Sequence, residues 1–162
     1  MLNTHWWHKL SHPEIFQGRL ERKRYFEGWY FKLVSAKQDH AIAIIPGIAL
    51  YDASDRHAFI QWIDGTGQVS GYHKFPLESF SADAWTLDVS IGPNHFSKER
   101  IRLQLPEIEG EIIFESTTPI KQNLLQPGIM GWYSFVPAMQ CYHGVVSLHH
   151  TLNGETQGML GK

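Results

Sequence analysis

The sequence has little of several features that identify common classes of protein. Its 162 residues include one cysteine, Cys141, which excludes an internal disulfide framework. No stretch of about 18 apolar residues is present that could span a membrane as a helix. The first residues, "MLNTHWWHKLSHPEIF", lack the apolar core of a signal peptide. These absences predict a soluble, cytoplasmic protein.

Charge of one sign is also scarce. The net charge is −2 with histidine neutral, so we expect no nucleic acid as partner. The sequence contains no phosphate-binding loop, GxSxG elbow or CxxC pair. Among the ten histidines, His143 and His149 would lie roughly 20 Å apart along a strand. His8 and His12 have helical spacing but lack a third ligand. We therefore predict no bound metal and no cofactor.

Short alternating segments are the main pattern that is present. Residues 57–63, 85–91 and 99–105 alternate between apolar and polar, and residues 40–50 are apolar and rich in β-branched side chains. The turn signals "YDASD", "DGTG" and "IGPN" separate such segments at intervals of roughly ten residues. The pattern predicts a mostly β fold for residues 1–162, a single antiparallel barrel-like domain with at most one short helix near the N-terminus.

The segment "FEGWYFK", residues 26–32, places one carboxylate among four aromatic rings. On a strand, Tyr25, Glu27 and Trp29 share a face, and a carboxylate that is charged and dry is costly there. Glu27 could be an acid whose pKa burial raises, able to deliver a proton. It could instead be a structural carboxylate that accepts Tyr, Trp or backbone donors, or that pairs with Arg24. Most buried charges have structural partners, so the residues alone favour the second interpretation.

A second aromatic block, "GIMGWYSFVPAMQCYHGVVSL", covers residues 128–148. Cys141 and His143 would share a strand face, which suggests a thiol–imidazole pair. Without a third, orienting group, a buried structural thiol is the favoured interpretation.

The basic segment "GRLERKRYF", residues 18–26, runs into aromatic residues and follows Trp6 and Trp7. Such a patch could rest on anionic lipid headgroups, which would make peripheral membrane contact a further expectation. A solvated basic face explains the same residues and is the favoured alternative.

The two aromatic motifs together resemble the tocopherol cyclase family, specifically its shorter bacterial relatives. The motifs are "YFEGWYFK" (25–32) and "GWYSFVPAMQCYHGVVSL" (131–148), with weaker similarity in "HAFIQ", "FPLESFSA" and "IGPNHFS". The resemblance covers most of the chain. It implies lipocalin-like β-barrel domains and an enzyme that closes a ring on a prenylated phenol.

The resemblance also assigns expected roles to individual residues. Ring closure requires a proton donated to an alkene and a phenol oxygen that adds to the resulting cation, with no metal or redox cofactor. The alternative is a non-catalytic, lipocalin-like binder of a lipophilic small molecule. The candidate acid is Glu27, Trp29 is the candidate cation-facing ring, and the remaining candidate ligand-binding residues are Tyr30, Trp132, Tyr142 and His143.

The sequence departs from the family pattern in three places. Gln140 stands where a glutamate is expected in bacterial relatives, and His149 where an aspartate is common. Relatives continue with a second half, whereas this sequence ends at "GMLGK", where that half would begin. We therefore expect a homodimer in which each copy replaces the missing half of the other, with Trp132 or Tyr133 in the interface.

Overall fold

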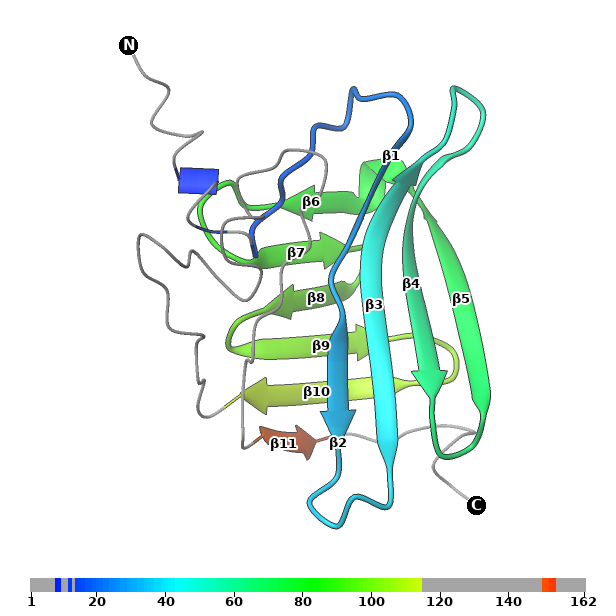
Figure 1. The fold of residues 1–162 in the computed structure, drawn as a ribbon, viewed down its shortest axis with the longest axis vertical. Helices are drawn as coiled ribbons and strands as arrows, with labels where there is room; N and C mark the ends of the chain where they lie inside the picture. The colour runs from blue at the N-terminus through cyan, green and yellow to red at the C-terminus, as the bar shows by residue number, and fades with distance from the viewer. Residues whose placement is uncertain (1–7, 10–11, 13, 115–149, 154–162) are drawn as a thin grey trace, which may run out of the picture.

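Two antiparallel sheets make up the part of the chain that the computed structural model describes, residues 8–9, 12, 14–114 and 150–153 (Figure 1). The first sheet contains β1 (Tyr25–Gly28), β2 (Phe31–Val34), β3 (Ala41–Leu50), β4 (Arg56–Asp64) and β5 (Val69–Pro76). The second contains β6 (Phe80–Ala82), β7 (Asp88–Ile91), β8 (Asn94–Ser97), β9 (Arg100–Gln104), β10 (Glu109–Phe114) and β11 (His150–Asn153). The prediction of a mostly β, antiparallel fold is confirmed.

The strands follow one another as a meander. From β3 to β10 each strand pairs with the next, except where the 3-10 turn η1 (Leu77–Ser79) carries the chain into the second sheet. The strands of the second sheet run across those of the first (Figure 1). Near the N-terminus residues 8–9 are helical, and His12 N donates to His8 O (2.9 Å). No helix among the described residues is long and apolar enough to cross a membrane.

The expected closed barrel is not found within the described residues, where the strands form two separate sheets. Side chains, and not backbone pairing, fill the space between the edge strands β1 and β6. The ring of Phe16 lies 5.3 Å from that of Phe80 on β6 and 6.4 Å from that of Trp29, which follows β1. A ladder between these edges would require their backbones to be roughly 5 Å apart, and the ring of Phe16 packed against Trp29 and Phe80 prevents that approach.

β1 and β2 are two halves of one edge strand, with a single continuous register on β3. The ladder is interrupted opposite Pro46, which has no N–H to donate, although Pro46 O still accepts from Trp29 N (2.9 Å). No bulge shifts the alternation, so Glu27 and Trp29 point toward the second sheet. Phe26 and Tyr30 point away from it and are 60% and 63% exposed.

Apolar side chains from the inward faces of both sheets form one core. The ring of Phe31 on β2 stacks on that of Phe96 on β8, with centroids 5.9 Å apart. Each fully buried large apolar side chain contributes about 1.5–3 kcal/mol relative to an exposed one. The described core residues with the lowest exposure include Ile44, Ile48, Leu50, Ile60, Val89, Ile91, Phe96 and Ile101. Side chains therefore occupy the space between the two sheets.

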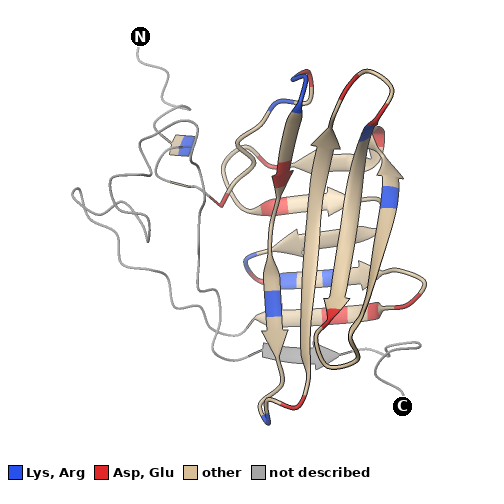
Figure 2. Cartoon of the chain, turned by 45° about the vertical axis from the view of Figure 1, so that its right-hand side comes forward, with Lys and Arg blue, Asp and Glu red and all other residues tan. Residues whose placement is uncertain are grey.

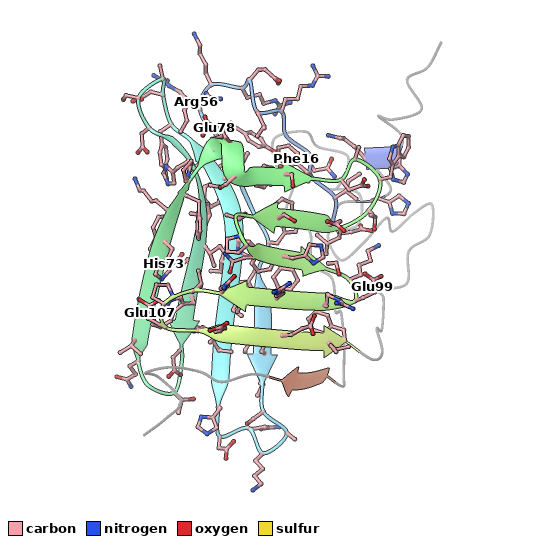
Figure 3. The ribbon with its side chains drawn as sticks, turned by 180° about the vertical axis from the view of Figure 1, so that it is seen from behind. Phe16, Arg56, His73, Glu78, Glu99 and Glu107 are labelled. Atoms are coloured by element: carbon pink, nitrogen blue, oxygen red, sulfur yellow. The ribbon has the colours of Figure 1, made fainter. Side chains whose placement is uncertain are left out.

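A contact between a histidine and a carboxylate also links the two sheets at their far side. His73 Nε2 on β5 lies 2.7 Å from Glu107 Oε2, in the loop between β9 and β10 (Figure 3). The two contacting atoms are buried, but the side chains are 22% and 41% exposed, and partly exposed pairs of this kind contribute about 0–1 kcal/mol. The apolar core, rather than this pair, therefore holds the sheets together.

Candidate functional site

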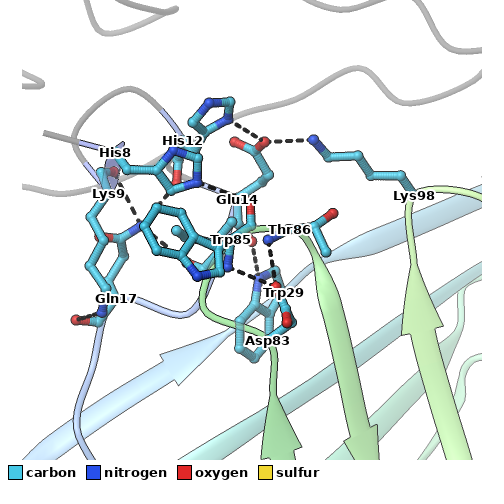
Figure 4. Close-up of polar contacts among 11 residues, drawn as sticks. His8, Lys9, His12, Glu14, Gln17, Trp29, Asp83, Trp85, Thr86 and Lys98 are labelled. Carbon is cyan, nitrogen blue, oxygen red and sulfur yellow. Dashed lines mark hydrogen bonds and ion pairs between the residues drawn. The ribbon is translucent and has the colours of Figure 1, made fainter. Parts of the chain in front are cut away.

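Residues 14–18, which we call the N-terminal strap, cover the opening between β1 and β6. Ile15 is fully buried, and the ring of Phe16 packs between those of Trp29 and Phe80. Trp29 Nε1 donates to Glu14 O (2.8 Å), a contact visible in Figure 4. The strap therefore contacts the edges of both sheets and covers the inward face of β1.

The second sheet holds the strap through its acidic residue. Lys98 Nζ, in the turn between β8 and β9, donates to Glu14 Oε1 (2.7 Å), and His12 Nδ1 lies 3.2 Å from the same oxygen (Figure 4). Burial acts to raise the pKa of the Glu14 carboxyl, but the hydrogen bonds from Lys98 and neighbouring groups lower it overall. Glu14 is therefore held in its ionised form by its neighbours.

Glu27 lies on the inward face of β1 beneath the strap. Its Oε1 accepts from Gln17 N (2.8 Å), and its Oε2 accepts from Gly18 N (3.0 Å) and from the Tyr25 hydroxyl. Burial raises the pKa of Glu27, and the bonds from Tyr25 and the two amides oppose that rise only in part. Arg24, expected from the sequence as one possible partner, is not among these donors.

Basic and aromatic groups surround the Tyr25–Glu27 pair. The Arg22 guanidinium lies over the Tyr25 ring, 5.1 Å from its centroid, beside an open hollow of about 480 Å³ lined by Arg19, Glu21 and Arg22. Lys9 Nζ donates to the backbone oxygen of the strap at position 17 (3.2 Å). Burial lowers the pKa of Lys9, and the charge of Glu27 partly opposes this. The basic segment predicted from the sequence therefore borders the site (Figure 2, blue).

The structure brings together some of the predicted site residues and separates others. Trp29 shares the inward face with Glu27, and its ring stacks on that of Phe80 with centroids 6.5 Å apart. Tyr30 lies on the opposite face of the strand, so it cannot line the same space as Glu27. The other predicted ligand-binding residues and the predicted thiol pair, Trp132, Tyr142, His143 and Cys141, lie outside the described residues.

The sequence indicated a tyrosine or backbone donor for Glu27, but it did not identify which amides those are. Alternation placed Tyr25 on the same face as Glu27, because a residue two positions away on a strand lies on the same face. The amides of Gln17 and Gly18 carry no side-chain signal that would place them there. Gly18 is required for a close approach, since a Cβ at this position would lie 2.7 Å from Cζ of Tyr25. Among the described residues no group of three His, Cys, Asp or Glu side chains could hold one metal ion.

The arrangement can hold a proton on the Glu27 carboxyl, to which the Tyr25 hydroxyl donates a hydrogen bond. Comparisons of the chain with protein families, with curated proteins and with solved structures found no match. The resemblance to tocopherol cyclases therefore rests on the quoted motifs.

Proposed function

We propose that this protein is a cyclase-type isomerase that closes a ring on a prenylated phenol or a related lipophile, with Glu27 as the acid. The observation that carries the proposal is the raised pKa of Glu27, a carboxyl on the same strand face as Trp29. A carboxyl that keeps its proton nearer to neutral pH can protonate an alkene without a metal. The motif resemblance supports the same chemistry.

The proposed reaction is an isomerisation, so all atoms of the substrate are retained. Glu27 gives its proton to one alkene carbon, and the substrate's phenol oxygen adds to the tertiary cation on the other carbon. The phenol proton returns to the carboxylate, which the Tyr25 hydroxyl stabilises through its bond to Oε2. The indole face of Trp29 would stabilise the passing cation by about 1–2 kcal/mol.

A non-catalytic binder of a lipophile is the second candidate. It is favoured by one observation, namely that the amides of Gln17 and Gly18 already bond both oxygens of Glu27. On this hypothesis the Glu27 carboxyl has only a structural role, as the hydrogen-bond acceptor that holds the strap against β1. For either function we propose that the whole chain forms a lipocalin-like barrel and that a second copy completes the site.

Substitution of Glu27 by Gln tests the two functions. The probe is a prenylated hydroquinone, with ring closure followed by chromatography and binding followed by quenching of Trp fluorescence. We expect Glu27→Gln to abolish ring closure while it retains binding. The matched control is Glu21→Gln, which removes an exposed carboxylate from the adjacent hollow and should change neither.

Two outcomes would contradict the proposal. Ring closure by Glu27→Gln at the wild-type rate would show that Glu27 is not the acid. Binding by the wild type without any product would leave the binder as the function. Thermal midpoints of all variants, measured in parallel, separate loss of chemistry from loss of folded protein.

A further inference from the structure

The outer face of the first sheet carries three stacked aromatic rings. The ring of Phe59 on β4 lies between those of Phe26 on β1 (centroids 5.6 Å apart, planes at 18°) and Tyr72 on β5 (5.2 Å, 13°). Phe59 is buried in this stack, although it points away from the core, and its ring lies against the backbone of β3. That approach requires Gly47, because a Cβ there would lie 2.6 Å from Cζ of Phe59.

A chain of hydrogen bonds ends at the outermost ring on β5. His57 Nδ1 lies 2.8 Å from Asp55 Oδ1, and His57 Nε2 lies 2.9 Å from the Tyr72 hydroxyl. His57 is 6% exposed, whereas the side chain of Tyr72 is 46% exposed. The imidazole is therefore buried between two groups that reach solvent, the Tyr72 phenol and the Asp55 carboxylate, whose side chain is 46% exposed.

The direction of each bond follows from the chemistry of the groups. An ionised carboxylate can only accept, so Nδ1 of the neutral imidazole carries the proton and donates to Asp55. Nε2 is then left to accept from the Tyr72 hydroxyl. Burial raises the pKa of Tyr72, and the nearby Tyr51 and Asp55 add to the rise. The phenol therefore stays protonated and points its hydrogen at a base.

Other charged and titratable groups near His57 do not displace this arrangement. Lys74 Nζ, on the same face of β5, lies 3.4 Å from Asp55 Oδ1 and leaves the bond from Asp55 to His57 intact. The ring of Tyr51 lies 6.4 Å from that of His57 between centroids, and both nitrogens of His57 already have Asp55 and Tyr72 as partners. Asp55 is thus placed to orient the imidazole.

We propose that Asp55, His57 and Tyr72 form a second reactive site, in which Tyr72 accepts an acyl group from an aromatic ester. A hydroxyl within 2.6–3.2 Å of a base, which a third group orients, is the arrangement of activated nucleophiles in acyl transfer. Two exposed rings beside this group, Phe26 stacked on Phe59 and Tyr51 next to His57, offer apolar contacts to the aromatic part of such an ester.

The proposed step is balanced without any further reactant. The Tyr72 oxygen bonds to the ester carbonyl carbon as its proton passes to His57 Nε2. The ester carbon–oxygen bond then breaks, and the leaving phenolate takes that proton from the imidazolium, whose charge faces Asp55. The products are an acylated Tyr72 and a free phenol. Water can hydrolyse the acyl group with His57 again as base.

The second site is independent of the proposed cyclase chemistry. Glu27 lies on the inward face of β1, whereas Tyr72, Phe59 and Phe26 lie on the outward face of the same sheet. A variant at either site leaves the hydrogen bonds of the other unchanged, so the two proposals can fail separately.

The test is acetylation of the full chain by 4-nitrophenyl acetate, with release of 4-nitrophenol measured by absorbance and the acetyl group located by peptide mass spectrometry. We expect acetylation at Tyr72 before any other tyrosine. Tyr72→Phe should abolish the label there, and it preserves the ring on Phe59. His57→Ala should slow acetylation on the order of 10²-fold, the range for loss of a general base. Added imidazole should restore much of that rate.

The chain provides matched controls on the same face. Tyr30 and Tyr51 are 63% and 55% exposed, both more than Tyr72, so exposure alone predicts that they react first. Asp55→Asn should slow acetylation of Tyr72 and leave that of Tyr30 unchanged, and Asp55→Glu should restore part of the rate. Equal labelling of Tyr30, Tyr51 and Tyr72, or a rate at Tyr72 that His57→Ala does not change, would overturn the proposal.

Discussion

The contribution of the hydrogen bond between the Tyr25 hydroxyl and Glu27 to stability can be measured by removing the hydroxyl oxygen. Tyr25→Phe keeps the ring that packs under Gly18 and beneath Arg22, and deletes only the donor to Glu27 Oε2. A hydrogen bond to an ionised group contributes about 1.5–3 kcal/mol, against about 0.5–1.5 kcal/mol for a neutral one. Above the folded-state pKa of Glu27, where its carboxylate is ionised, we therefore expect a loss of about 2 kcal/mol in the free energy of unfolding, nearer the charged value than the neutral one.

The same substitution should have a smaller effect in mild acid. Burial holds the folded-state pKa of Glu27 above its unfolded value, so the stabilisation from its bound proton is complete below the unfolded pKa. It is lost as pH rises through the folded pKa. The hydrogen bond from Tyr25 acts to lower the folded-state pKa of Glu27, so Tyr25→Phe raises that pKa further. The variant therefore loses more of its free energy of unfolding than the wild type as the pH rises toward neutral. In acid, where the Glu27 carboxyl is protonated, Tyr25→Phe removes only a hydrogen bond to a neutral group, which contributes less to stability.

A double-mutant cycle isolates the interaction. Urea unfolding, followed by circular dichroism, is measured for wild type, Tyr25→Phe, Glu27→Gln and the double variant at neutral and mildly acidic pH. We expect a coupling free energy of about 1–2 kcal/mol above the folded-state pKa of Glu27 that shrinks as the pH falls below it. If Tyr25→Phe costs the same at both pH values and in both backgrounds, the hydroxyl does not bond an ionised Glu27, and the pKa argument is wrong.

Three further substitutions test the fold, with each free energy of unfolding measured by urea denaturation. Gly47→Ala should destabilise by about 1–3 kcal/mol, because its Cβ meets the ring of Phe59, whereas an alanine at Gly65, where the nearest side-chain atom is 3.8 Å away, should cost less. Ile60→Ala opens a cavity in the core and should cost about 2–5 kcal/mol; a cost below 1 kcal/mol would contradict the packed core. Trp29→Phe removes the bond to the backbone oxygen at position 14 and should cost about 1 kcal/mol. An unchanged midpoint would show that this bond does not hold the strap.

The strands were predictable where alternation is regular, and their ends were not. The predicted segments 40–50, 57–63 and 99–105 correspond closely to β3, β4 and β9. The segment 85–91 was predicted as one strand, but β7 begins at Asp88. Asp83 Oδ1 accepts from the amides of residues 85 and 86 (2.7 and 3.0 Å), which extends the preceding turn.

The candidate sites were predictable only in part, because periodicity fixes a face and not a partner. Alternation places Glu27 on one face and Tyr30 on the other, as found, so Tyr30 was a poor candidate for the same ligand as Glu27. The partners of Glu27 in the strap are backbone amides, which every residue carries. His57 and Tyr72 come together only because the side chain of Tyr72 leans along β5 over Phe59, and that direction depends on packing rather than on sequence spacing. Among the described residues, the separation of the two sheets at β1 and β6 likewise depends on side chains packed between strand edges.

The strap has a consequence for the order in which the chain folds. Strands β3 to β10 pair mostly with their neighbours in sequence, so their contacts close short loops, whereas Lys98 reaches Glu14 across 84 residues and His8 reaches Trp85 across 77. Contacts of long sequence separation carry the greater loop-closure entropy, and the strap should therefore dock after the meander has formed. It should also be the first segment to open under native conditions. The amides of Gln17 and Gly18 are predicted to exchange with solvent deuterium earlier than those of β3 and β4, and each such opening would expose the Glu27 carboxyl while the sheets remain folded.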